Sequence, residues 1–305
     1  MNDLIYSDPN TLLLDQNKCI EILTDALKYG SLNLIIGAGV SLSTKKDGFP
    51  GWAELTKSCC EKTSIDYDDN ESSQNKYLLK KLESVRKSCL DNGKDFNQIV
   101  NESLYENIEY NIDLLKTDLL IAIGALVMNS SKSNLANVIN YNFDDLLEWY
   151  LTFYGFDLQV ISDSNHLITS SDINIYHPHG FLPKCERFVD FISEKIILSN
   201  RDYVEAGWNI DFWNSIQHNI LSNKINLFIG MSGEDTHVES LCQYSYDKII
   251  DKNRLLGIMV LSLKNKSEIT EQQNLSNGIV TYYISDHSEL PDLLLNISRQ
   301  ARGII

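Results

Sequence analysis

The stretch Leu32-Asn33-Leu34-Ile35-Ile36-Gly37-Ala38-Gly39-Val40-Ser41 decides how this chain folds. Its first five residues are nearly all apolar and predict a short buried strand, which is followed by two glycines within three positions. Glycine permits a tight turn and lets a phosphate approach the backbone, so the stretch is typical of the first strand-to-helix turn of an α/β protein. The signal alone is weak, because Leu42 stands where the full Gly-x-Gly-x-x-Gly motif has its third glycine. A tight turn without a ligand is the alternative.

Six further segments have the length and composition of strands, and helical segments separate many of them. This alternation predicts a Rossmann-like α/β fold, with a mainly parallel sheet and helices on both faces. The predicted strands are 137–141, 157–161, 174–177, 225–229, 255–261 and 279–284, and the predicted helices of this part are 18–30, 145–154, 202–222, 235–250 and 290–302.

A long segment after the first strand is helical in pattern almost throughout, with helices predicted at 77–90, 96–105 and 112–128. The polar stretch 66–75 within it resembles a solvated loop. We therefore expect residues 53–135 to form a helical insertion module, and residues 1–52 and 136–305 to form the Rossmann-like core.

Composition excludes several classes of protein. The 305 residues carry 42 Asp and Glu against 26 Lys and Arg, a net charge of −16, which argues against direct binding to nucleic acid. The longest apolar run, Leu119–Met128, is too short to span a bilayer, and the N-terminus does not resemble a signal peptide. The six cysteines form no Cys-x-x-Cys pair, so we expect reduced thiols and a cytoplasmic protein that does not bind membranes.

A second motif, Asn140-Tyr141-Asn142-Phe143-Asp144-Asp145-Leu146-Leu147-Glu148, follows a predicted strand. Asp145 and Glu148 have the spacing of a capping box and predict the start of a helix. Asn142 and Asp144 are not needed for that cap, so they are candidates for ligand binding. The alternative is that they satisfy the backbone of the loop, as polar residues at such turns usually do.

The third motif is His177-Pro178-His179-Gly180. Pro178 ends a strand, and Gly180 permits a sharp turn. A histidine at a strand end can act as a general base near neutral pH, whereas a hydrogen-bonded loop histidine is the structural alternative. A metal site formed by His177, His179 and Cys185 is a third interpretation, but it lacks an evident fourth ligand.

The fourth motif is Gly230-Met231-Ser232-Gly233-Glu234-Asp235, in which Ser232 and Asp235 again have the form of a capping box. Small residues and a free hydroxyl at a helix start also suit a ribose or a phosphate. All four motifs follow the carboxyl ends of predicted strands, where ligands bind in open α/β sheets.

In their order along the chain, the four motifs resemble the sirtuin superfamily, and specifically its bacterial defence branch of sirtuin-like NAD hydrolases. Gly-Ala-Gly-x-Ser comes first, followed by Asn-x-Asp, His-Gly and Gly-x-Ser. The resemblance runs from about residue 31 to residue 250 and implies that the Rossmann-like core binds NAD. Further matching segments are Pro50-Gly51-Trp52-Ala53-Glu54-Leu55, Asp144 to Glu148, Ile197-Leu198-Ser199-Asn200-Arg201-Asp202-Tyr203, and Asp235 to Leu241.

The resemblance implies a role for each matching residue. Asn142 would bind the nicotinamide-side ribose and position water, Asp144 would orient the nicotinamide amide, and His179 would be the general base. The remaining residues would bind the cofactor: Gly37, Ala38, Gly39 and Ser41 at the pyrophosphate and its adjacent ribose, Gly230 and Ser232 at the adenosine ribose, and Trp52 and Asp235 within their matching segments.

Two departures from the deacetylating sirtuins decide between activities. Those enzymes resemble each other in a zinc module with two Cys-x-x-Cys pairs, whereas the interval 180–229 of this chain contains only Cys185. They also carry Phe-Arg after the glycine loop, where this chain has Gly51-Trp52. We therefore expect an NAD+ glycohydrolase that releases nicotinamide and ADP-ribose, with NAD+ as substrate and no metal. The alternatives are a non-catalytic NAD or ADP-ribose sensor and an NAD-dependent protein deacylase.

The same resemblance implies a role in antiphage defence by abortive infection, through depletion of NAD. Because unchecked NAD hydrolysis kills a cell, such an enzyme is expected to be inactive until it is triggered. About 55 residues follow Ile250, enough to complete the sheet but not to form a large sensor domain. We therefore expect control through a homo-oligomer or through a separately encoded activator, such as a translocase-type ATPase or a nucleic-acid-binding protein.

Overall fold

The computed structural model describes residues 9, 12, 15–43, 48–128, 135, 137–164, 171–199, 201–202, 212–233, 235–249 and 254–303. Within these residues, seven strands form one sheet in the order β3-β4-β2-β1-β5-β6-β7, and every neighbouring pair is parallel. The predicted α/β fold is confirmed. The strands are β1 Leu32–Ile36, β2 Val138–Asn140, β3 Leu158–Ile161, β4 Ile173–Tyr176, β5 Ile225–Ile229, β6 Gly257–Ser262 and β7 Ile279–Ile284.

The first strand lies in the middle of the sheet, and all five of its residues are buried. On one side Leu34 pairs with Val138 of β2, and on the other side Leu32 pairs with Ile225 of β5. The chain builds β2, β3 and β4 on one side of β1 before it crosses to build β5, β6 and β7 on the other. The topological switch therefore lies between β1 and β5, at their carboxyl ends, where ligands bind in folds of this kind.

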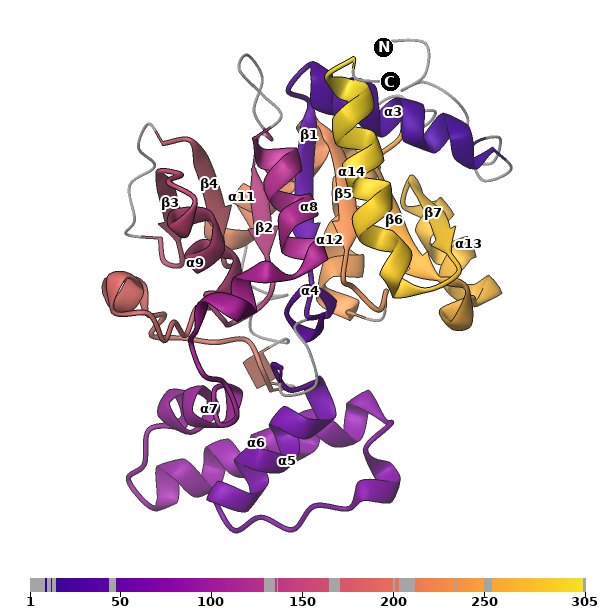
Figure 1. Cartoon of the computed structure of the whole chain (residues 1–305). Helices are drawn as coiled ribbons and strands as arrows, with labels where there is room; N and C mark the ends of the chain where they lie inside the picture. The colour runs from indigo at the N-terminus through magenta and orange to yellow at the C-terminus, as the bar shows by residue number, and fades with distance from the viewer. Residues whose placement is uncertain are drawn as a thin grey trace.

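Helices cover both faces of the sheet (Figure 1). Successive residues of a strand point to opposite faces, so Leu34 belongs to one core cluster and Ile35 to the other. A further helix, α13 (Glu268–Ser276), packs beside β7. The first face is covered by α3 (Gln16–Lys28), α8 (Asp118–Val127), α9 (Leu146–Phe153) and α14 (Leu290–Ala301), and the second by α11 (Phe212–Asn223) and α12 (Thr236–Lys248).

The segment between β1 and β2 is helical, as the sequence predicts. Its helices α5 (Trp52–Lys62), α6 (Asn75–Asp91) and α7 (Phe96–Leu104) pack together beyond the carboxyl edge of the sheet, past the short helix α4 (Gly39–Leu42) (Figure 1). Short 3-10 turns, η1 (Asp69–Glu71) and η2 (Ile112–Lys116), lie between and after them.

The prediction of one helix over 112–128 is wrong. The 3-10 turn η2 ends at Lys116, and the side chain of Thr117 accepts a hydrogen bond from the Leu120 N–H at 3.3 Å, which starts α8 afresh. Helix α8 packs against α14 on the sheet, and the Ser298 hydroxyl donates to the Ala125 carbonyl at 3.0 Å. The division of the chain into a core and a module at residues 53–135 stays a prediction.

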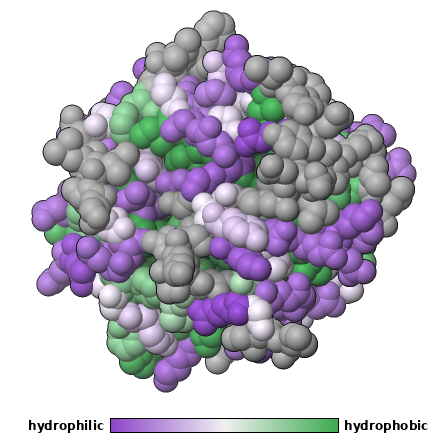
Figure 2. Space-filling model, turned by 90° about the horizontal axis from the view of Figure 1, so that it is seen from above, coloured by the Kyte–Doolittle hydropathy of each residue, from purple (hydrophilic) through white to green (hydrophobic). Residues whose placement is uncertain are grey.

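The face of the molecule seen in Figure 2 is mainly polar where its residues are described. Seen from above, hydrophilic residues surround small, separate hydrophobic patches (Figure 2). Among the described residues, no helix has the length and apolar character needed to cross a membrane. All six cysteines are free thiols, and burial raises the pKa of Cys59 and of Cys242 to about 12, so these two are inert at neutral pH.

Candidate functional site

The four motifs meet at one edge of the sheet. The carboxyl ends of β4, β2, β1 and β5 follow one another across the sheet. His177 comes directly after β4, Asn142 two residues after β2, Gly37 after β1 and Gly230 after β5. Motifs that lie far apart in the sequence are therefore neighbours in space.

The two glycine turns pack backbone against backbone. The Gly37 N–H donates to the Ile229 carbonyl at 3.0 Å, and the Gly39 N–H donates to the Gly230 carbonyl at 2.8 Å. A Cβ at Gly37 would lie 2.6 Å from the Gly230 oxygen, and a Cβ at Gly230, whose φ is +66°, would lie 2.8 Å from the nitrogen of Val40. This close packing by itself requires glycine, so the structural interpretation of the loop is sufficient for these positions. A role in phosphate binding stays a prediction.

Asn142 is held by four hydrogen bonds. Its side-chain nitrogen donates to the Gly37 carbonyl at 3.2 Å and to the Ser41 hydroxyl at 3.1 Å. Its backbone N–H donates to the side-chain oxygen of Asn140, and its carbonyl accepts from Nδ1 of His177, both at 3.1 Å. Because a carbonyl only accepts, the amide nitrogen must face Gly37. Among the described residues Oδ1 of Asn142 has no partner, so this is the atom through which Asn142 can orient a ligand hydroxyl or a water.

Asp144 lies on the other side of Ser41. The Ser41 hydroxyl hydrogen-bonds to the Asp144 carboxylate, which also accepts from the Leu146 N–H at 3.1 Å. Burial raises the pKa of Asp144 to about 7, the bonds from Ser41 and Leu146 oppose this rise, and the nearby carboxylate of Glu148 adds to it. The hydrogen bonds from Asn142 to Ser41 and from Ser41 to Asp144 therefore connect the glycine loop to the start of α9.

His179 belongs to a second group of side chains, which includes residues at the start of α12. Its Nε2 is 3.4 Å from Nδ1 of His237, and its ring packs on the ring of Tyr141 with 4.6 Å between the centroids. Burial lowers the pKa of His179, while the charge of Asp235 raises it and that of His237 lowers it further. The ring is therefore uncharged at neutral pH and able to accept a proton.

The residues around Asn142 and the residues around His179 are linked by two sets of contacts. Asn142 bonds to Gly37, and the turn of Gly37 bonds to Gly230. Asp235 and His237 follow the Gly230 turn, His237 contacts His179, and His179 packs on Tyr141, the neighbour of Asn142. The predicted residues Gly37, Gly39, Ser41, Asn142, Asp144, His179, Gly230 and Asp235 thus surround one region of the sheet edge.

Three predicted residues lie at the margin of this region. Ala38 is exposed in the turn before α4, and Ser232 is exposed in the turn after β5. Trp52 is half-buried at the first position of α5, where it packs against the main core cluster. Their contacts with a cofactor stay predictions.

Both predicted capping boxes are wrong in detail. The Asp145 side chain makes no capping bond; Asp144 accepts from the Leu146 N–H instead, and Glu148 points to His177. Before α12, Asp235 is itself the N-cap and accepts from the N–H groups of His237 and Val238, so Ser232 does not cap the helix.

The Asp145 carboxylate instead joins the helical segment to the site. It accepts from the hydroxyls of Tyr105, at 3.0 Å, and Tyr110, and from the N–H groups of Lys184, at 3.1 Å, and Cys185, at 2.7 Å. A second connection runs from Arg86 of α6 to Asp202 at 2.7 Å. Asp202 also accepts from the Ser199 N–H at 2.8 Å, which gives the Ser-x-x-Asp segment a role in folding.

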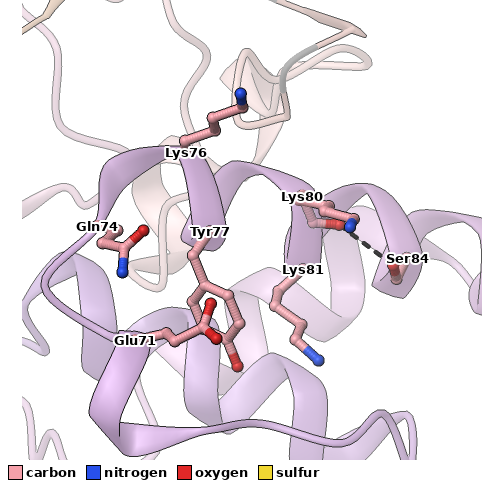
Figure 3. A pocket seen from close by; sticks show the side chains of 7 residues that line it. All are labelled: Glu71, Gln74, Lys76, Tyr77, Lys80, Lys81 and Ser84. Carbon is pink, nitrogen blue, oxygen red and sulfur yellow. Dashed lines mark hydrogen bonds between the residues drawn. The ribbon is translucent and has the colours of Figure 1, made fainter.

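No group of three or more His, Cys, Asp and Glu side chains in the described part of the chain is arranged to hold a metal. Both ring nitrogens of His177 are bonded to Glu148 and Asn142, so the structure does not support the metal interpretation with His179 and Cys185. A surface cavity of about 430 Å³ lies on α6, lined in part by Lys76, Tyr77 and Lys80 (Figure 3). None of the predicted site residues lines it, and it is not part of the candidate site.

Sequence reasoning missed three residues that contact the candidate site: Tyr141, His237 and Glu148. A histidine in the first turn of the helix that follows Gly-x-Ser is a usable signal for His237, because that turn lies at the carboxyl edge. Tyr141 stands beside Asn142 and carries the ring on which His179 packs, yet in sequence it reads as part of a strand. Glu148 reads as a capping residue, and only the position of β4 reveals its partner.

A model of the SIR2-like domain family matches residues 136–282. The matched segment includes Asn142, His179 and Gly230, whereas β1 and its glycine loop lie outside it. The structure places β1 between β2 and β5, which are both in the matched segment, so the glycine loop completes the same sheet edge. No curated protein matches the chain.

Proposed function

Because the SIR2-like domain match at residues 136–282 supports a sirtuin-like family member, we propose that this chain is an NAD+ glycohydrolase. SIR2-like domains use NAD+, which is the premise for the substrate. The proposed reaction breaks the bond between nicotinamide and ribose and adds water to the ribose. Its products are nicotinamide, ADP-ribose and one proton.

The observation that carries the proposal is the hydrogen bonding of Asn142. Four hydrogen bonds fix its backbone and its amide nitrogen, while its side-chain oxygen has no partner among the described residues. An oxygen fixed in this way can accept from a ribose hydroxyl or from the attacking water without reorganisation during the reaction. Because nicotinamide leaves as a neutral base and the positive charge moves to the ribose, positioning supplies most of the catalysis that is needed.

His179 is suited to receive the proton from water. Burial keeps its ring uncharged, so one nitrogen can act as acceptor at neutral pH. Its lowered pKa makes it a weak base, and a weak base is sufficient where the ribose carbon is already strongly electrophilic. Ser41 would hold the side chain of Asn142, and Asp144 would hold the nicotinamide amide. The turns at Gly37 and Gly230 would lie along the dinucleotide.

The absence of a zinc module favours hydrolysis over deacylation. Only one cysteine, Cys185, lies between His179 and Gly230 in the sequence, and its thiol is free. The two Cys-x-x-Cys pairs that accompany acyl-peptide binding in deacetylating sirtuins cannot form from a single cysteine.

We extend the proposal to the biological role. Loss of NAD+ is lethal to a cell, which suits a defence enzyme that acts after phage infection and is controlled by self-assembly into a homo-oligomer or by a separately encoded activator. Cellular NAD+ measured through a phage infection, with and without this chain, tests that role; NAD+ that stays constant in both would contradict it.

The chemical test uses purified protein, NAD+ and chromatographic measurement of nicotinamide. Asn142→Ala removes the fixed acceptor, and misplacement of the reacting groups costs about 10²-fold in rate. His179→Ala removes the proposed base, which costs about 10²- to 10⁴-fold. Both variants are expected to remain folded by circular dichroism.

Two substitutions serve as matched controls. Asn137→Ala changes a residue at the opposite end of β2 from Asn142, where its amide bonds to Asn33 at 3.1 Å. His218→Ala removes a half-buried histidine of α11 that bonds to Ser245. Both controls are expected to release nicotinamide at the wild-type rate. Wild-type rates in Asn142→Ala and His179→Ala would exclude the proposed roles, and intact NAD+ bound to the wild type would favour the sensor.

A further inference from the structure

A second histidine of the site, His177, has no step in the proposed reaction. Its imidazole is fully buried, as is Glu148 of α9. Nε2 of His177 lies 2.9 Å from Oε1 of Glu148, and Nδ1 lies 3.1 Å from the carbonyl oxygen of Asn142. The ring of Phe181 packs against the imidazole, with 4.3 Å between the centroids. Contacts with both nitrogens and with the ring therefore fix the position of His177.

These contacts determine which nitrogen of His177 donates to Asn142. The Asn142 carbonyl only accepts, so Nδ1 carries a hydrogen and donates it. On the other side of the ring, one proton lies between Nε2 and the Glu148 carboxyl group, whichever of the two atoms holds it. In either arrangement the donor to Asn142 is the same. The pair therefore supplies a fixed donor and needs no net charge to do so.

Asn140 completes the arrangement. Its side-chain oxygen accepts from the Asn142 N–H at 3.1 Å, and its side-chain nitrogen donates to Oε1 of Glu148 at 3.4 Å. The peptide groups on both sides of Asn142 are thus held by side chains that meet at Glu148. A buried histidine–carboxylate pair adds little to stability compared with apolar residues of similar size. Its main consequence here is the orientation of the Asn142 backbone.

The geometry points to His177 and Glu148 as positioning residues, which hold the backbone of Asn142 so that its side-chain oxygen faces the nicotinamide ribose. Neither residue touches the substrate, and both act through Asn142. This inference rests on the proposed function, because it takes Asn142 as the residue that contacts the ribose.

Two substitutions of His177 separate positioning from packing. In His177→Asn, the amide nitrogen lies near the former position of Nδ1, so the donor to the Asn142 carbonyl is kept and the bond to Glu148 is lost. In His177→Gln, the amide lies near the former position of Nε2, so the bond to Glu148 is kept and the donor to Asn142 is lost. Both variants lose the imidazole ring and its packing on Phe181.

We expect His177→Asn to release nicotinamide at least about tenfold faster than His177→Gln, because only the first keeps Asn142 oriented. The difference is expected in kcat, with a smaller change in KM for NAD+, because the fixed oxygen acts mainly in the transition state. Urea denaturation of both variants gives their stability. Equal rates in the two variants, or rates that follow their stabilities, would overturn the inference.

Glu148 gives an independent test. Glu148→Gln can donate to Nε2 of His177 but no longer accepts from Asn140 at the same atom, so its rate is expected to fall less than that of Glu148→Ala. Glu148→Ala removes the partner, and its rate is expected to fall to the level of His177→Gln. Equal loss in both Glu148 variants would refute the positioning role. A wild type that does not release nicotinamide refutes the proposed function itself, whereas an active wild type with equal variants refutes only this inference.

Discussion

Burial shifts the pKa values of two side chains of the candidate site in opposite directions. The pKa of Asp144 rises to about 7, so folded protein binds a proton there that the unfolded chain has already lost at that pH. The pKa of His179 falls, so folded protein binds its proton more weakly than the unfolded chain does. On acidification, Asp144 therefore favours the folded state, and His179 opposes it.

The contribution of Asp144 to stability can be isolated by Asp144→Asn, which resembles the protonated acid. The favourable contribution of Asp144 is fully present below pH 3.8 and is lost as the pH rises through about 7. We expect the free energy of unfolding of the variant to exceed that of wild type at both pH 5 and pH 8, and the excess to be about 1–3 kcal/mol larger at pH 8. Urea denaturation at the two pH values measures this. The same difference at both pH values would contradict the assigned shift.

At the scale of elements, the glycine turns that follow β1 and β5 pack against each other. This packing determines how closely the carboxyl ends of the two strands approach. Gly230→Ala places a Cβ 2.8 Å from the nitrogen of Val40, at a φ of +66°. Gly93→Ala is the matched control, because its φ is +64° and no described atom lies within 4 Å of the added Cβ. The left-handed conformation alone costs about 1–2 kcal/mol.

We expect Gly93→Ala to lower the free energy of unfolding only by the cost of the left-handed conformation. Gly230→Ala is expected to lower it by about 1–3 kcal/mol more, because the added Cβ clashes with the neighbouring turn. The difference between the two free energies of unfolding, from urea denaturation, measures the cost of this clash. Equal losses at the two positions would show that the backbone conformation alone requires glycine at Gly230.

Most elements could be predicted from sequence where one local pattern determined them. The bounds of β1 and β5 agree with the prediction, because each is a run of five mostly apolar residues bounded by polar residues or glycine. Helix α13 was not predicted, because its sequence Glu-Ile-Thr-Glu-Gln-Gln-Asn-Leu-Ser has few apolar residues and no clear periodicity. The predicted helix 202–222 lies partly outside the described residues; its described part agrees with α11.

In the candidate site, too, residues in local motifs could be predicted, whereas contacts between distant segments could not. Asn142 and His179 could be named because they lie in short motifs at strand ends. The partners of Asp145 could not, because Tyr105, Tyr110, Lys184 and Cys185 come from segments whose spatial relation depends on the order of strands in the sheet. Local patterns predict elements, whereas the contacts between distant segments determine which polar side chains bond to each other.

At the scale of the whole molecule, Asp145 connects the helices beyond the sheet edge with the loop that follows Asp144. Tyr110→Phe removes one donor from this buried carboxylate and is expected to lower the free energy of unfolding by about 1–3 kcal/mol. Tyr67→Phe is the control within the same helical segment, because its hydroxyl donates to the Ala53 carbonyl at 3.1 Å and not to Asp145.

We expect the control to lose less stability than Tyr110→Phe in parallel urea titrations. The connection also predicts that Tyr110→Phe slows nicotinamide release, since Asp145 neighbours Asp144 in the chain, whereas Tyr67→Phe leaves the rate unchanged. Two variants of equal stability and equal activity would show that the connection at Asp145 has no consequence for the folded protein.

We propose that Asn142, His179 and the Gly37 turn form one site that cleaves NAD+. The most direct measurement is a time course of NAD+, nicotinamide and ADP-ribose, by chromatography, with wild-type protein and with Asn142→Ala. We expect wild type to convert NAD+ into equal amounts of nicotinamide and ADP-ribose, and Asn142→Ala to do so about 10²-fold more slowly. Undiminished NAD+ with wild type, or equal conversion by both proteins, would contradict the proposal.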